Sequence, residues 1–221
     1  MAKGDKTRQI DNFHCFRGAG FVYWRAKASG LQPSRETHAS PDGHAFDYAA
    51  DVDGFAMNNG GILMPAETTL GLRKLFRFYP STGKAKYAIG SNWWQDLDAL
   101  KVMTSYALDH NMTLSRAAQL LLIIPKDWGD CANILIAKPT VVLKAFVGKG
   151  APVAISQKGK STSPDGKRAA GTAIYAAAPG NNLEQIYLPG EPALLSHVLQ
   201  EVATHHIDIR GTITPPIPLY L

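Results

Sequence analysis

The chain has 221 residues, of which 45% are hydrophobic and 19% are charged, and this composition is typical of a globular protein rather than a disordered one. A chain of this length buries roughly 70% of the surface that its unfolded form exposes, so it needs no disulfide or metal to fold. We predict a single domain over residues 1–221. The formal net charge of +5 favours partners that carry phosphate.

The N-terminal residues, the apolar runs and the cysteines indicate the cellular location of the protein. The first eight residues are charged and no apolar segment follows them, which argues against a secretion signal. The longest apolar run, Leu120 to Ile124, is far shorter than the roughly 20 residues that a membrane-spanning helix needs. Cys15 and Cys131 lie in apolar segments and predict buried free thiols. We expect a cytoplasmic protein without a membrane span, or one delivered into a target cell by a machine that reads no N-terminal signal.

The first third of the chain is predicted to be rich in strands and loops. Residues 13–25 predict a strand, a glycine turn and a second, aromatic-rich element. Residues 30–60 are rich in Gly, Pro, Ser, Asp and Asn, a composition that predicts a long excursion over the surface. Short strands are expected at 61–65 and 73–79.

Two helices are predicted next. Apolar residues recur at three- and four-residue spacing between 97 and 108, as in a helix with one buried face. Thr113 is the expected N-cap of a second, buried helix, which Pro125 ends. Trp93 and Trp94 precede the first helix, where an aromatic residue can staple the entering chain.

The remainder of the chain is predicted to be mostly strands. The spacers between the strands are too short for crossover helices, so antiparallel pairing is favoured. A polar, basic loop over 157–171 separates two of the strands, and a final helix is expected over 192–205, followed by a strand at 207–210. The predicted strands are 134–136, 141–147, 153–156, 172–177 and 183–188. Together these elements predict an α+β fold with mostly antiparallel sheets and flanking helices.

Two motifs with familiar spacing are set aside. Residues 158–162 imitate the end of a phosphate-binding loop, but Ala154 stands where the first glycine is needed and Pro164 breaks the helix that should follow. His197, Glu201 and His205 are spaced by four on the predicted last helix. We expect them to form a solvated helix face, and we assign no metal site, because the HExxH signature is absent.

The remaining polar residues match what a dinucleotide requires. An arginine early in the chain, Arg17, can hold a diphosphate through paired charge-assisted hydrogen bonds. The hydroxyls of Ser161, Thr162 and Ser163 can orient a carboxylate. Glu184 opens a late strand, where it can hold a ribose hydroxyl and stabilise the cationic centre that forms when a nicotinamide bond breaks.

Aromatic residues complete this predicted site. Trp93 or Trp94, or alternatively Tyr23 or Trp24, can stack on the nicotinamide ring. Together with the residues above, they predict an enzyme that consumes NAD.

The order of an early arginine, a Ser-Thr-Ser triplet and a late glutamate running into Leu-Pro-Gly resembles the Arg-Ser-Glu class of bacterial ADP-ribosyltransferase toxins. This resemblance implies packed antiparallel sheets with NAD bound in a cleft. It makes Arg17 the contact to the NAD phosphates, Ser161 the motif serine and Glu184 the catalytic residue, and Asn182 stands where the family has Gln or Glu. It also implies an ADP-ribosyltransferase or NAD glycohydrolase acting as a toxin or effector, with a macromolecular target and an immunity protein as partners.

Two other classes of function compete with this one. Basic residues concentrate in 73–86 and 149–168, and Phe76, Phe78 and Tyr79 alternate with them, as a platform for single-stranded nucleic acid would require. The alternative function is therefore a nucleic-acid-binding or nucleolytic protein. The third is an interaction module whose loops at 30–60 and 157–171 dock a protein partner.

Overall fold

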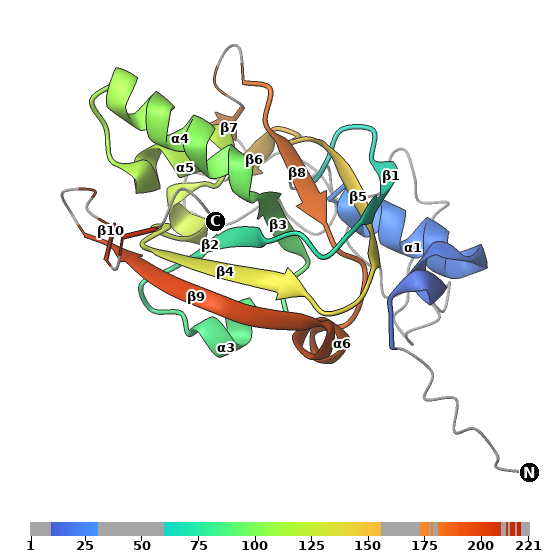
Figure 1. The fold of residues 1–221 in the computed structure, drawn as a ribbon. Helices are drawn as coiled ribbons and strands as arrows, with labels where there is room; N and C mark the ends of the chain where they lie inside the picture. Colours follow the sequence, from blue (N-terminus) through green and yellow to red (C-terminus); the bar gives the residue numbers. More distant parts are fainter. Residues whose placement is uncertain are drawn as a thin grey trace, which may run out of the picture.

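A computed structural model describes residues 10–30, 60–155, 173–176, 178, 181–208, 211, 213–214 and 216–217. Within these residues, antiparallel strands form one large sheet, and helices pack on both of its faces (Figure 1). The helices are η1 (Phe13–Phe16), α1 (Gly18–Ala28), α3 (Ala85–Ala88), α4 (Leu97–Asp109), α5 (Leu114–Leu121), η2 (Lys126–Trp128) and α6 (Pro192–Val198). The strands are β1 (Ala66–Leu70), β2 (Leu75–Tyr79), β3 (Trp93–Asp96), β4 (Asn133–Pro139), β5 (Leu143–Lys149), β6 (Val153–Ile155), β7 (Ala173–Tyr175), β8 (Glu184–Tyr187), β9 (Leu199–Ile207) and β10 (Ile213–Thr214).

The short strand β3 joins the two halves of the large sheet. The strand order is β1-β5-β8-β3-β2-β4-β9-β10, while β6 and β7 form a separate pair. The first two residues of β3, Trp93 and Trp94, pair with β8, whereas Gln95 and Asp96 pair with β2. No other residues of β2 and β3 are paired. The two strands therefore diverge along Arg77–Tyr79 and leave an opening in the sheet.

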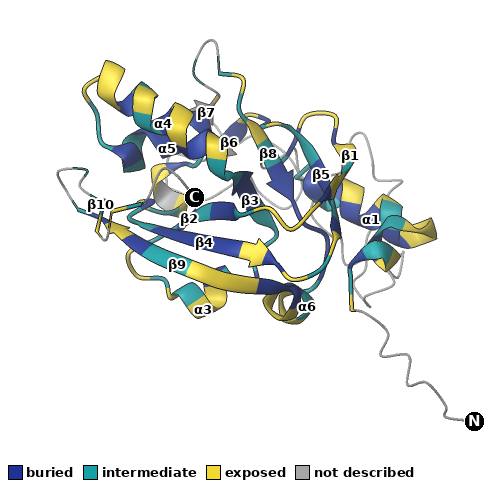
Figure 2. Cartoon of the chain, viewed as in Figure 1, coloured by how far each residue is buried: buried dark blue, intermediate teal, exposed yellow. Residues whose placement is uncertain are grey.

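Successive side chains of each strand point to opposite faces of the sheet, so the core is divided between the two faces. Strand β4, in the middle of the sheet, is mostly buried (Figure 2). On one face, residues such as Phe76 and Ile136 pack against α4 and α5. The same face of the neighbouring strands carries Phe146 and Tyr187, which pack against α1. The opposite face is covered by α3 and α6. Helix α1 and the α4–α5 pair therefore cover different parts of one face.

The predicted fold class is confirmed as an α+β arrangement with an antiparallel sheet. The start of each middle helix also follows the prediction. The Thr113 hydroxyl accepts a hydrogen bond from the backbone N–H of Arg116 at 3.2 Å, and α5 begins at the next residue after Thr113. Asp96 caps α4 in the same way, because its carboxylate accepts from the N–H of Asp98 at 3.1 Å.

The predictions for the ends of the chain were wrong in two places. Residues 13–25 form η1 and most of α1 rather than a strand and a turn, because the aromatic side chains of α1 are buried against the sheet and this packing overrides their strand propensity. The predicted helix over 192–205 ends at Val198, and β9 follows at once. Strand β4 offers β9 a long ladder of backbone hydrogen bonds, which a helix would leave unmade.

Smaller differences concern the segments around these elements. Residues 61–65 contribute only a single bridge, between Ile62 and Gly150, and the strand begins at Ala66. Trp93 and Trp94 precede α4 as predicted, but they form the first two residues of β3, which pairs with β8 and β2. The predicted loops lie outside the described residues, except for Gly30 and Gly60. None of the helices in the described part of the chain combines the length and apolar character that a membrane span requires.

Candidate functional site

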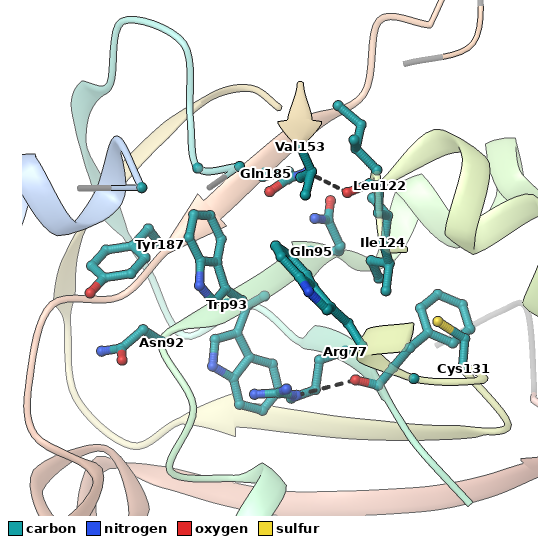
Figure 3. A pocket seen from close by; sticks show the side chains of 18 of the residues that line it. Arg77, Asn92, Trp93, Gln95, Leu122, Ile124, Cys131, Val153, Gln185 and Tyr187 are labelled. Atoms are coloured by element: carbon teal, nitrogen blue, oxygen red, sulfur yellow. Dashed lines mark hydrogen bonds between the residues drawn. The ribbon is translucent and has the colours of Figure 1, made fainter. Parts of the chain in front are cut away.

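A cavity of about 490 Å³ lies at the opening between β2 and β3, beside the ends of α1 and α5, and residues from both faces of the sheet line it (Figure 3). This volume is within the range of small-molecule sites. We call it the aromatic pocket and define it by its principal lining residues, which are Trp93, Trp128, Tyr187, Gln95, Gln185 and Ile123. Residues at the C-terminal ends of α1 and α5 form its two sides.

A close backbone contact holds the end of α1 beside the pocket. The N–H of Ile62 donates to the carbonyl oxygen of Ala28 at 2.7 Å. Gly61 has a φ of +91°, and a Cβ atom there would lie 2.4 Å from the backbone nitrogen of Gly30. Only glycine permits this approach, so the sequence at this point shapes the wall of the pocket.

The aromatic side of the pocket is held in a fixed orientation. The ring of Trp93 is half-buried and meets Tyr187 edge-to-face, with centroids 4.9 Å apart and an interplanar angle of 72°. Tyr187 is buried and lies against Trp24 of α1, with centroids 6.4 Å apart. A fixed indole beside a cavity is a surface on which another flat ring stacks favourably.

Gln95 is the buried polar residue of the pocket. It is only 5% exposed, and its Oε1 atom has no hydrogen-bond partner among the described residues. Figure 3 shows its side chain between Trp93 on one side and Leu122 and Ile124 on the other. Gln185 differs, because its Nε2 donates to the carbonyl oxygen of Leu122 at 2.9 Å.

Two cationic side chains also line the pocket. The Lys27 ammonium donates to the Tyr23 hydroxyl at 3.3 Å. The Arg77 guanidinium lies over the ring of Trp94 and donates to two backbone carbonyls, those of Ala88 at 3.2 Å and Phe78 at 3.4 Å. Burial lowers the pKa of Arg77 to about 10, so the side chain stays charged at neutral pH.

The pocket contains few groups able to transfer a proton. None of the described residues that line it is an aspartate, a glutamate or a histidine. Its thiol, that of Cys131, has a pKa raised to about 12, because burial first and the charge of Asp130 second disfavour the thiolate. The thiol is therefore a poor nucleophile at neutral pH. The described lining is suited to binding a neutral or anionic molecule.

The structure does not bring Arg17 and Glu184 together. Arg17 is exposed at the start of α1, next to Phe16, whose ring lies 4.9 Å from that of Phe146. Phe146 pairs with Tyr187, whereas Glu184 pairs with Lys149 at the other end of the ladder, roughly 10 Å further along the strand. Because successive side chains of a strand point to opposite faces of the sheet, Glu184 lies on the face opposite Tyr187 and Gln185. Its side chain is exposed.

The other predicted contacts to NAD are distributed differently. Trp93 and Trp94 both line the pocket, but Trp94 is buried, and its indole N–H donates to the carbonyl of Ser91 at 2.7 Å, so the ring available for stacking is that of Trp93. Tyr23 and Trp24 are residues of α1 and are buried where this helix packs against the sheet. Asn182 is exposed and accepts from the Lys149 ammonium at 3.1 Å. Ser161, Thr162 and Ser163 lie outside the described residues.

Sequence reasoning missed the amides of Gln95 and Gln185 and the guanidinium of Arg77 as pocket residues. A polar residue directly after two tryptophans is the one signal that pointed to Gln95. Arg77 belongs to the basic segment 73–86 of the sequence, and its burial depends on contacts with α3 and Trp94 that the sequence does not show.

Two of the rejected or competing sites are also clarified. His197 lies on α6, while Glu201 and His205 lie on β9, so the three do not share a helix face as predicted. Within the described residues, no three His, Cys, Asp or Glu side chains are grouped as a metal would require. Phe76 and Phe78 are buried in the core, and the predicted aromatic platform for single-stranded nucleic acid was therefore wrong.

Comparison of the chain with protein-family models, with curated proteins and with solved structures finds no significant match.

Proposed function

We propose that the protein binds a small planar ligand in the aromatic pocket, and that NAD, bound through its nicotinamide end, is the first ligand to test. The observation that carries this proposal is the composition of the pocket. Its described lining offers a fixed indole ring, two cations and a buried amide oxygen that no described residue pairs with, and none of these lining residues is a carboxylate. A flat ring attached to a negatively charged group complements each of these features.

The parts of NAD correspond to these features one by one. The nicotinamide ring is planar and stacks on Trp93. The diphosphate is anionic, and among the described lining residues Lys27 and Arg77 carry the charge that attracts it. The same cations disfavour ligands that carry a positive charge and no phosphate.

Calorimetric titration with NAD tests the proposal. We expect saturable binding to the wild type and an affinity about tenfold or more lower for Trp93→Ala, because stacking on an aromatic side chain contributes about 1–3 kcal/mol per base. Tyr87→Ala is the matched control, since Tyr87 is an exposed aromatic residue outside the pocket. Unchanged NAD affinity in Trp93→Ala would contradict the proposal.

A further inference from the structure

We infer that Gln95 selects ligands whose planar ring carries a carboxamide-like edge, with one N–H donor beside one acceptor. This inference rests on the proposed binding function and names the class of ligand that the aromatic pocket takes. It starts from the buried Oε1 atom of Gln95, for which the described part of the chain provides no hydrogen-bond partner, although the residue is only 5% exposed.

Other amides in the structure show how the fold treats such groups when they serve its architecture. Asn12 is fully buried, and its amide donates to the carbonyls of Lys144 and Pro189 while its oxygen accepts from the N–H of Lys144. Gln185 lines the same pocket and donates to Leu122. Gln95 is different, because its buried Oε1 atom has no partner among the described residues, and an unpaired buried atom costs stability instead of contributing to it.

The place where a partner for Gln95 can arrive is the pocket. Alternation on β3 puts Gln95 on the same face as Trp93, and its cross-strand neighbour Phe76 is apolar and offers no hydrogen bond. Figure 3 shows the amide at the cavity, beside the Trp93 ring. A ligand ring stacked on Trp93 therefore has its edge directed at Gln95.

The chemistry of an amide determines which edge fits. A glutamine side chain has one oxygen that accepts and one nitrogen that donates, and exchanging the two positions leaves one of each. A ligand carboxamide satisfies both atoms through a pair of N–H···O bonds. A carboxylate has no donor and a methyl ketone has none either, so each leaves the Gln95 oxygen unpaired.

Nicotinamide is one source of this edge, and an aminopurine such as adenine is another. The experiment is a titration of the protein with nicotinamide, nicotinate, 3-acetylpyridine and adenine, followed by calorimetry. We expect nicotinamide or adenine to bind about tenfold or more tightly than both nicotinate and 3-acetylpyridine, because only the first two provide the donor. The stronger of the two identifies the source.

Two variants assign this preference to Gln95. Gln95→Leu should bind nicotinamide and 3-acetylpyridine with nearly equal affinity, and Gln95→Glu, which accepts but does not donate at neutral pH, should lose affinity for nicotinamide. Gln200→Leu, an exposed position on β9, is the control and should keep the wild-type ratio. If the wild type binds nicotinamide and 3-acetylpyridine equally, this inference is overturned and the binding function stands. If none of the four compounds binds, both fail.

Discussion

Cys131 illustrates how its surroundings set the chemistry of a single residue. The side chain is buried beside α5, and its backbone carbonyl accepts a hydrogen bond from the Ser115 hydroxyl at 3.0 Å. Burial, with a smaller effect from Asp130, raises the pKa of the thiol from 9.0 to about 12. The folded protein thus keeps the thiol neutral at a pH where the unfolded chain ionises it.

Because of this difference in pKa, the stability of the protein falls as the pH rises into the alkaline range. The contribution of Cys131 to the free energy of unfolding is fully present below pH 9 and is lost as the pH rises towards 12. The loss is about 1.4 kcal/mol per pH unit, because in this range the unfolded state releases the thiol proton and the folded state keeps it. We expect wild type to lose about 1 kcal/mol more than Cys131→Ala between pH 8 and pH 10, measured by urea unfolding. Tyr79, whose pKa is raised by burial and by Glu201, contributes equally to both proteins. Parallel losses in the two proteins would show that the thiol does not titrate as described.

At the scale of elements, helices that begin with a local signal differ from segments whose structure depends on a distant partner. Thr113 and Asp96 each accept a hydrogen bond from a backbone N–H two or three residues ahead. Helix α5 starts where Thr113 predicts, and α4 starts where the apolar spacing predicts. Strand β9 has no such signal. Its residues were assigned to a helix on their apolar spacing, and pairing with β4 makes them a strand.

The cap of α5 can be tested by substitution. Thr113→Ala removes the hydroxyl that accepts from the N–H of Arg116 and should lower the free energy of unfolding by about 1 kcal/mol. Thr113→Ser keeps the hydroxyl and should recover most of that loss, as measured by chemical denaturation. Equal destabilisation in the two variants would mean that the methyl group, and not the cap, stabilises this turn.

At the scale of the whole molecule, the aromatic pocket exists because several distant segments meet over one opening in the sheet. Asn12 is a central link in this assembly, since it joins the segment before α1 to Lys144 in β5 and to Pro189 after β8. These contacts position α1 over the sheet, and α1 supplies one side of the pocket.

Replacing Asn12 with alanine should therefore be costly. Asn12→Ala leaves two buried carbonyl oxygens and one N–H without this partner, and we expect a loss of about 3 kcal/mol in the free energy of unfolding. Asn182→Ala, at an exposed asparagine with a single bond to Lys149, should change it by about 0.5 kcal/mol or less. A similar, small effect in both variants would argue against Asn12 as a structural link.

The sequence by itself determined the features that arise between near neighbours: the α+β class, the antiparallel pairing implied by short spacers, the two middle helices and the buried thiols. Only the tertiary structure decided that residues 13–25 form helices and that β9 replaces half of a predicted helix. It alone also decided that Trp93 and Gln95 line one cavity, whereas Arg17 and Glu184 lie apart from it. The physical reason is that helix caps and turns depend on bonds between residues a few positions apart. Burial, strand pairing and the composition of a pocket depend instead on residues brought together from across the chain.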